Sequence, residues 1–241
     1  MQNNPQNLKK KSSAGLDWDY GANSKRGPSQ WSTLSLDYGA CQMGLQQSPV
    51  NLQSMQTSSQ LRPLLFSFQA TKLDLRFDGR QLTASPRKSI SLKFQQKTFD
   101  WQKMVIHSPS EHQIDHVNSD LELQLEFAER ETGERLHLAI FASEGQAAQG
   151  SLMQFARLPS SDKPKVTWEL FQLQDWLPPK LSYIYYEGSQ SYPPCQEKLT
   201  WLVLREAVKI EHADLQRLAA LVDGKKRPLQ PLGQRVPLLS R

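Results

Sequence analysis

Two neighbouring runs of alternating residues constrain the fold of this chain more than any other feature. Residues 103–107, Lys-Met-Val-Ile-His, are β-prone and alternate between two faces, and Pro109 follows as a terminator. Residues 120–127 alternate four apolar side chains with two glutamates and a glutamine. A polar segment rich in turn residues joins the two runs, so an antiparallel pair is the simplest arrangement. The polar faces of both strands would then share one concavity.

The length and composition fit one sheet-rich globular domain. A chain of 241 residues can bury roughly 70% of the surface that its unfolded form exposes. Its many short segments, interrupted by 15 prolines and 12 glycines, favour strands over long helices. The sequence contains no run of 18 apolar residues, so it predicts no membrane-spanning helix. Residues 1–16 are polar, lysine-rich and aperiodic, which predicts a disordered basic arm before a domain over residues 17–241.

The net charge of +5 is concentrated in two short basic runs, Lys9–Lys11 and Lys225–Arg227. Both lie among loop-forming residues, and solvated ends of the domain explain them more simply than an acidic partner does. The sequence contains no nucleic-acid-binding motif. The first residues also lack the apolar core of a signal peptide, so the chain is either cytosolic or has lost a leader.

Two further segments have weaker patterns. Apolar side chains at helical spacing predict a helix over residues 212–222, with Gly224 as its C-cap. The segment from residue 145 to residue 179 mixes polar and apolar residues without a clear period, and we expect one short helix and loops there.

Several motifs occur in the order in which one known family carries them. They are the aromatic segment Trp18–Trp31, the element Gln47–Leu52, the strand and turn Lys103–His112, the run Tyr185–Cys195, the strand Trp201–Val208 and the closing segment Arg227–Val236. In these motifs the chain resembles the α-class carbonic anhydrases over roughly residues 17–240. The resemblance implies a single mainly β domain, with a large, mostly antiparallel, twisted central sheet and a few surface helices.

The residues that carry the chemistry of that family are altered here. Family members hold zinc with three histidines, and the fourth ligand is a water whose pKa falls far enough to supply a hydroxide for attack on CO₂. The resemblance places the three ligand positions at Val105, His107 and Gln124. Valine has no lone pair, and the oxygen of a glutamine amide is a weak zinc donor. Two of the three ligands are therefore missing, and we expect no cofactor.

The strand pairing predicts what fills the former site. A register that sets Val105 opposite Gln124 fixes the neighbouring pairs, because two steps along one strand are two steps back on the other. Those pairs are Lys103 with Glu126 and His107 with Glu122. Together with Gln124 and His137, these side chains are expected to close the cavity as a polar network.

A rebuilt metal site is the alternative interpretation. Its ligands would be His107, His137 and Glu126, two imidazoles and one carboxylate, a set that suits zinc or non-haem iron. Glu126 and His137 replace valines that line the family's CO₂ pocket, whereas Leu199 and Trp201 remain apolar.

Other positions of the family's catalytic apparatus are expected to persist only as structure. Ser191 replaces the threonine that orients zinc-bound hydroxide, and we expect its bond to Glu111 to survive. Lys88 takes the place of the proton-shuttling histidine, and a lysine pKa of about 10.4 makes it a poor relay at neutral pH. His112 and His116 are interpreted as residues of a polar loop.

The two cysteines, Cys41 and Cys195, stand where secreted members of the resembled family carry a disulfide. Closing a loop of that length stabilises a protein by about 5 kcal/mol in the chain-entropy model. A disulfide implies an oxidising compartment, such as a periplasm or an organelle lumen, and we favour this over the cytosol.

These observations favour a carbonic-anhydrase-like pseudoenzyme that serves as a scaffold or interaction subunit in a larger protein assembly. The second interpretation is a metal-dependent lyase that hydrates CO₂ at the rebuilt site. The sequence does not specify the partner or the oligomeric state.

Overall fold

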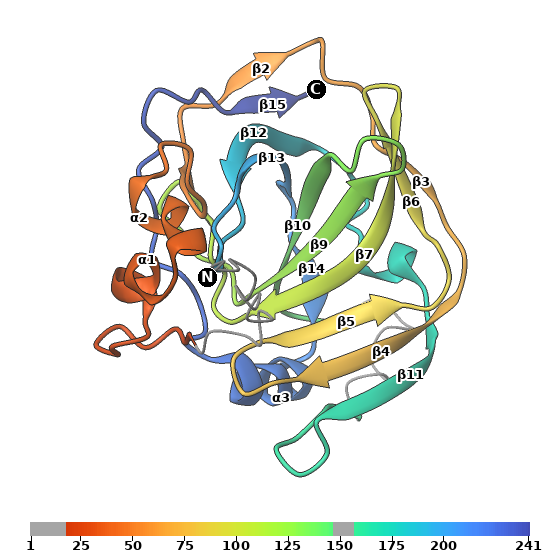
Figure 1. Cartoon of the computed structure of the whole chain (residues 1–241). Helices are drawn as coiled ribbons and strands as arrows, with labels where there is room; N and C mark the ends of the chain where they lie inside the picture. Colours follow the sequence, from red (N-terminus) through yellow and green to blue (C-terminus); the bar gives the residue numbers. More distant parts are fainter. Residues whose placement is uncertain (1–17, 147–156) are drawn as a thin grey trace, which may run out of the picture.

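A computed structural model describes residues 18–146 and 157–241 of the chain (Figure 1). Within this part, thirteen strands form one large twisted sheet, and two further short strands pair separately. The arm expected over residues 1–16 lies outside the described residues.

The elements are short at the two ends of the chain and long in its middle. The strands are β1 (Asn51–Leu52), β2 (Gln56–Ser58), β3 (Leu65–Ser67), β4 (Thr71–Phe77), β5 (Leu82–Pro86), β6 (Ser91–Phe94), β7 (Lys97–His107), β8 (Gln113–Ile114), β9 (Leu121–Glu129), β10 (Arg135–Glu144), β11 (Lys165–Phe171), β12 (Tyr183–Ser189), β13 (Glu197–Leu204), β14 (Val208–Ile210) and β15 (Leu238–Ser240). The helices are α1 (Trp31–Leu34), α2 (Ala40–Met43) and α3 (His212–Val222), with 3₁₀ turns η1 (Pro28–Gln30), η2 (Leu36–Tyr38) and η3 (Leu173–Trp176).

The sheet is mostly antiparallel, as expected from the sequence. Its order is β11-β4-β5-β7-β9-β10-β13-β12-β15-β2, and β3, β6 and β14 attach beside this path. Only the pairs β10–β13, β10–β14 and β15–β2 are parallel in this sheet. The central strands β7, β9 and β10 therefore pair with a neighbouring strand on both edges (Figure 1).

The register of β7 and β9 is the one that the sequence predicts. Val105 lies opposite Gln124, and the pairs Lys103 with Glu126 and His107 with Glu122 follow from it. A register shift between Trp101 and Lys103 does not disturb these pairs. The polar side chains of both strands therefore share one face, as the alternation requires.

The opposite face of the central strands is apolar and forms the larger core. It includes Leu121, Leu123, Leu125 and Phe127 of β9, which alternate with the polar residues of the same strand. α3 packs Leu218 and Val222 into this core, and the helix has the bounds that its spacing predicts. Among the described residues, no helix is long and apolar enough to cross a membrane.

An aromatic cluster closes the polar face from the N-terminal side. Trp18 packs edge-on against Tyr20 and Trp31, with ring centroids 5.1 and 5.4 Å apart. The cluster also contains Val105 and Tyr192, together with the linked cysteines. The Cys41–Cys195 disulfide is present, as the resemblance implies. It ties the N-terminal segment to the loop after β12.

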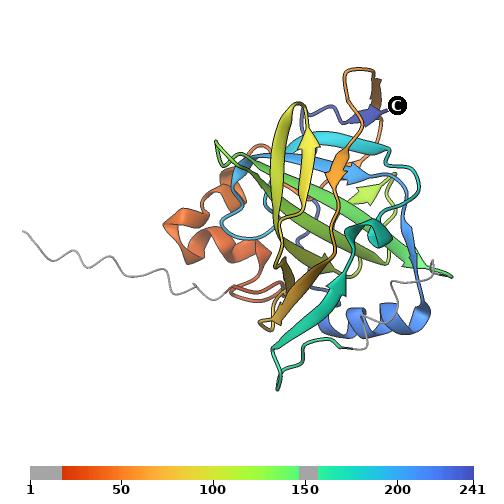
Figure 2. The same cartoon turned by 90° about the vertical axis from the view of Figure 1, so that its right-hand side faces the viewer.

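The sequence analysis was wrong about the segment before residue 179. Besides the short turn η3, this segment contains β11, which pairs antiparallel with β4 along one edge of the sheet (Figures 1 and 2). The register shifts between Trp168 and Phe171, which interrupts the two-residue alternation by which a strand is recognised. Residues 147–156 of the same segment lie outside the described part.

Candidate functional site

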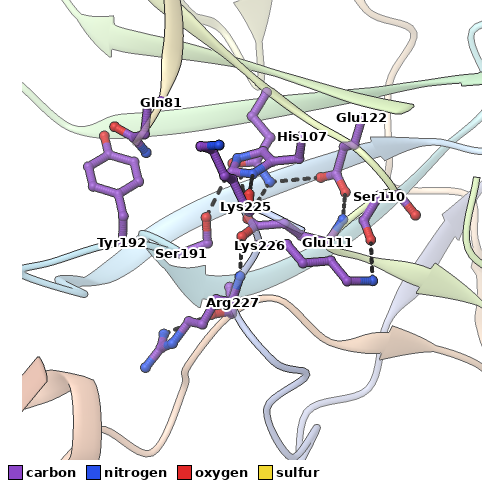
Figure 3. A network of polar contacts seen from close by, with 12 residues as sticks. Gln81, His107, Ser110, Glu111, Glu122, Ser191, Tyr192, Lys225, Lys226 and Arg227 are labelled. Atoms are coloured by element: carbon purple, nitrogen blue, oxygen red, sulfur yellow. Dashed lines mark hydrogen bonds and ion pairs between the residues drawn. The ribbon is translucent and has the colours of Figure 1, made fainter. Parts of the chain in front are cut away.

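His107 ends β7 and is held by a backbone carbonyl from the segment after α3. Its Nδ1 donates a hydrogen bond to the carbonyl oxygen of Lys225 at 2.8 Å (Figure 3). Its Nε2 therefore points the other way, 3.6 Å from Oε2 of Glu111, and is buried without a hydrogen-bond partner among the described residues. The ring is thus fixed in one orientation, with one nitrogen directed into the polar face.

Gln124 occupies the centre of the polar face. Its Nε2 donates to Oε2 of Glu111 at 2.8 Å and to Oε1 of Glu122 at 2.9 Å. The hydroxyl of Ser191 donates to Oε1 of Gln124 at 3.3 Å. The expected bond from Ser191 to Glu111 is thus replaced by a bond to Gln124, because the amide of Gln124 lies between them. All polar atoms of this amide are used inside the protein.

Glu122 faces His107 in the strand register but binds His112 instead. Its Oε2 accepts the backbone N–H groups of Glu111 and His112, both at 2.8 Å, and its Oε1 accepts Nδ1 of His112 at 2.7 Å. Burial alone would raise the pKa of Glu122, but the attraction and hydrogen bonds of His112 lower it to about 2. His112 lies in the loop between β7 and β8, as expected, but its side chain is fully buried. The sequence feature that could have indicated this burial is the position of His112 directly after Glu111, in the turn between two strands.

The polar network continues from His112 to β12 on the same face of the sheet. Nε2 of His112 lies 2.5 Å from the hydroxyl of Tyr186, which lies 2.9 Å from Oγ of Ser48. Arg227 closes the network: its backbone N–H donates to Oε1 of Glu111 at 2.7 Å. Burial lowers the pKa of the Arg227 guanidinium to about 10, although Glu111 raises it. Both carboxylates of the network are therefore satisfied by protein donors, and Glu111 receives one of them from a distant segment.

A second cluster lies farther along the same face. The hydroxyl of Tyr192 donates to Oε1 of Glu126 at 2.6 Å, and Nζ of Lys103 lies 3.3 Å from the same oxygen. Lys103 also donates to the Tyr192 hydroxyl at 2.8 Å. Burial, followed by the negative charge of Glu126, raises the pKa of Tyr192 well above its ordinary value. Sequence reasoning expected Lys103 and Glu126 to meet but missed the tyrosine, which comes from a loop far along the chain.

His137 lies at the inner end of this cluster. Its Nε2 is 3.9 Å from Oε2 of Glu126, and its ring packs edge-on against Trp201 with centroids 4.9 Å apart. Its Nδ1 is buried without a partner among the described residues. Burial lowers the pKa of His137 to about 4, against a smaller opposing attraction from Glu126. Leu199 and Trp201 belong to a neighbouring apolar cluster, so this end of the polar face is covered.

Two predicted site residues lie away from both clusters. Lys88 is exposed after the end of β5, where its backbone N–H donates to Oγ1 of Thr71 at 2.9 Å. His116 is exposed and contacts the amide of Asn51.

Comparison with known proteins places this geometry in a family. A family model described as eukaryotic-type carbonic anhydrase matches residues 26–238. The chain belongs to the eukaryotic-type carbonic anhydrase family. It is 28% identical over 223 residues to a carbonic anhydrase of Pectobacterium carotovorum, which covers 92% of this chain and 90% of that protein.

The family includes relatives that carry another name. The chain is 29% identical over 233 residues to dioscorin DB3L of Dioscorea polystachya, covering 90% of this chain and 83% of that protein. The solved structure of the Photobacterium profundum alpha-carbonic anhydrase superposes with a TM-score of 0.83 at 26% identity, covering 92% of this chain and 100% of that one. Membership of the carbonic anhydrase family is therefore established by sequence and by fold.

The residues present do not fit the zinc ion of the carbonic anhydrase family. Of the three ligand positions, only His107 offers a free ring nitrogen; Val105 offers none, and the Gln124 amide is fully used within the protein. Within residues 18–146 and 157–241, no three His, Cys, Asp or Glu side chains gather in a way that could hold a metal ion. His107 and His137 also belong to different clusters, so the alternative ligand set is not assembled.

Proposed function

We propose that this member of the carbonic anhydrase family has no carbonate dehydratase activity and works as a scaffold or interaction subunit, in an oxidising compartment such as a periplasm or an organelle lumen. The observation that carries the first part is Gln124. Its amide forms three buried hydrogen bonds at a position where the family chemistry needs an imidazole lone pair. Val105 is packed into the aromatic cluster and supports the same conclusion.

Metal analysis with a restoring variant tests the loss of activity. Purified, tag-free wild-type protein is expected to hold substoichiometric zinc and to hydrate CO₂ at the background rate. Because Val105 and Gln124 oppose each other beside His107, the variant Val105→His/Gln124→His presents three imidazoles to one point. We expect this variant to take up about one zinc ion per chain, measured by elemental analysis.

The control adds His107→Ala to the restoring variant and is expected to abolish the gained zinc. Stoichiometric zinc in the wild-type protein, or CO₂ hydration well above background, would overturn the proposal. If that zinc were lost in Glu126→Ala and His137→Ala, the rebuilt metal site would be the correct interpretation instead.

Exposed apolar residues near α2 support the interaction role. Leu36, Met43 and Leu45 lie within ten residues of one another, and their side chains are 102%, 77% and 87% exposed. Large apolar side chains gathered on a surface often mark contacts with other proteins. The disulfide supports the proposed compartment, because such bonds persist in oxidising surroundings.

Gel filtration with light scattering on extracts of the native source tests the interaction role. The wild-type chain is expected in a complex larger than a monomer, and the variant Leu36→Asp/Met43→Asp/Leu45→Asp is expected as a monomer. A matched variant with exposed Val117→Asp, 68% exposed on a different loop, should stay in the complex. A monomeric wild-type chain would contradict the assembly role and leave the metal result unaffected.

A further inference from the structure

Strands β11, β4 and β5 run side by side along one edge of the sheet (Figure 1). A basic groove lies over these strands. It has a volume of about 920 Å³ and, besides six neutral residues, is lined by five basic side chains and one carboxylate. These are Arg76, Arg87, Arg157, Lys163, Lys165 and Asp74. The groove is therefore strongly positive and large enough for a small molecule.

The groove is the outward end of a row of residues that begins at the former zinc site. Gln124 lies opposite Val105, Val105 opposite Thr83, Thr83 opposite Arg76, and Arg76 opposite Lys165. Residues that oppose each other in register share one face of a sheet. Four strand spacings separate Gln124 from Lys165, roughly 19 Å. The groove is thus on the same face as the polar clusters but distinct from them.

Only one of the cations in the groove has a carboxylate partner. Arg87 forms a two-pronged bond to Asp74, with both N···O distances at 2.8 Å, and the hydrogen bond from Arg87 holds the pKa of Asp74 below its ordinary value. In the part of the chain that the structure describes, no ion pair involves Arg76, Arg157, Lys163 or Lys165. Within the described residues, four positive charges of the groove therefore have no ion-pair partner.

The strand pairing places two of these positive charges directly against each other. Arg76 and Lys165 are directly opposed across β4 and β11, a position in which like charges destabilise a sheet. On the same two strands, Lys72 instead meets a carboxylate and pairs with Glu169 at 2.5 Å. The opposition of Arg76 and Lys165 therefore differs from the pairing of opposite charges at Lys72 and Glu169. A bound anion would reduce the repulsion between the two positive side chains.

We propose that this groove binds a compact small molecule that carries at least two phosphate groups. A monocarboxylate would neutralise one of the four charges, whereas a di- or triphosphate carries enough charge for most of them. The guanidinium groups of Arg76 and Arg157 are planar forks that match phosphate oxygens, and the two lysines contribute point charges. This inference is independent of the zinc positions and of the proposed scaffold role.

Isothermal titration calorimetry with inorganic tripolyphosphate at low salt tests the proposal. The wild-type chain is expected to show saturable binding, and Arg76→Ala/Lys165→Ala is expected to weaken it by about tenfold or more, because charge-assisted contacts are lost. The matched control Lys97→Ala/Arg130→Ala removes the same charge from two cations that pair with Glu134 and Asp100 and do not line the groove. It should change the affinity by less than about twofold.

Thermal unfolding shows whether each variant is folded. If Arg76→Ala/Lys165→Ala fails to fold, the variant Arg157→Ala/Lys163→Ala takes its place in the binding measurement. Citrate at equal concentration serves as a trianion without phosphate and is expected to bind more weakly than tripolyphosphate. Absence of saturable binding, equal losses in the test and control pairs, or citrate binding as tight as that of tripolyphosphate would each overturn the proposal.

Discussion

At the scale of the residue, His137 shows how a buried imidazole without full hydrogen bonding makes stability depend on pH. Its native pKa is about 4, compared with an ordinary value of 6.5. As pH falls below 6.5, the unfolded chain takes up a proton at this residue that the folded chain does not accept. Stability is therefore lost between about pH 6.5 and pH 4, by roughly 3 kcal/mol in total, and this contribution does not change further below pH 4.

The variant His137→Leu is expected to lose this part of the pH dependence. It should be as stable as the wild-type chain at pH 7 or more stable, because an unpartnered buried nitrogen is replaced by an apolar group. Urea unfolding at pH 7, 5.5 and 4 measures the effect, with the exposed His116→Leu as a control that keeps the wild-type slope. An unchanged pH dependence in His137→Leu would show that other groups cause it.

The residues of the site were predictable to different degrees. Val105, Gln124 and the Lys103–Glu126 pair follow from alternation and register, which are local rules. Tyr192 was missed because it arrives from a loop far along the chain, and no periodic pattern predicts where a loop side chain points. The solvated end expected over Lys225–Arg227 was wrong for Arg227, which is buried with 2% of its surface exposed. The sequence also did not predict that Glu122 forms a hydrogen bond with His112 and not with His107. This contact depends on the path of the turn at Ser110 and Glu111.

At the scale of the element, the long central strands were predictable and the edge strand was not. β9 carries regular alternation because one face is core and the other is the polar face, and the polar residues of β7 follow the same two-residue period. β10 is instead a nearly continuous apolar run that is buried on both faces. β11 borders solvent on its outer side, and its register shift breaks the alternation. Tertiary pairing with β4 thus decides the structure of this segment. The same pairing brings Lys165 opposite Arg76, so the missed strand is also the one that creates the basic groove.

At the scale of the whole molecule, the disulfide and Arg227 join segments that are distant in sequence. Cys41 and Cys195 are 154 residues apart, and a guanidinium nitrogen of Arg227 donates to the carbonyl oxygen of Cys41 at 2.8 Å. The long loop restricts the unfolded chain, so removing the disulfide with Cys41→Ser/Cys195→Ser is expected to lower the free energy of unfolding by about 5 kcal/mol. Guanidinium unfolding of the oxidised protein and the variant measures this difference.

Reduced wild-type protein serves as the control for that prediction, because it should unfold at nearly the same denaturant concentration as the double serine variant. A loss below about 1 kcal/mol would show that the Arg227 contacts and the aromatic cluster hold the N-terminal segment without the covalent link.

The pairing of β15 with β2 has a consequence for biosynthesis. β15 lies between β12 and β2, so residues 238–240 are the only strand through which residues 56–58 join the main sheet in the described part of the chain. Residues 56–58 therefore have no partner strand in this sheet until residues 238–240 have been synthesised. Pairing between segments so far apart in sequence forms slowly and leaves strands exposed in the meantime. A chain released before residue 238 would leave that early strand open to partners other than its own sheet.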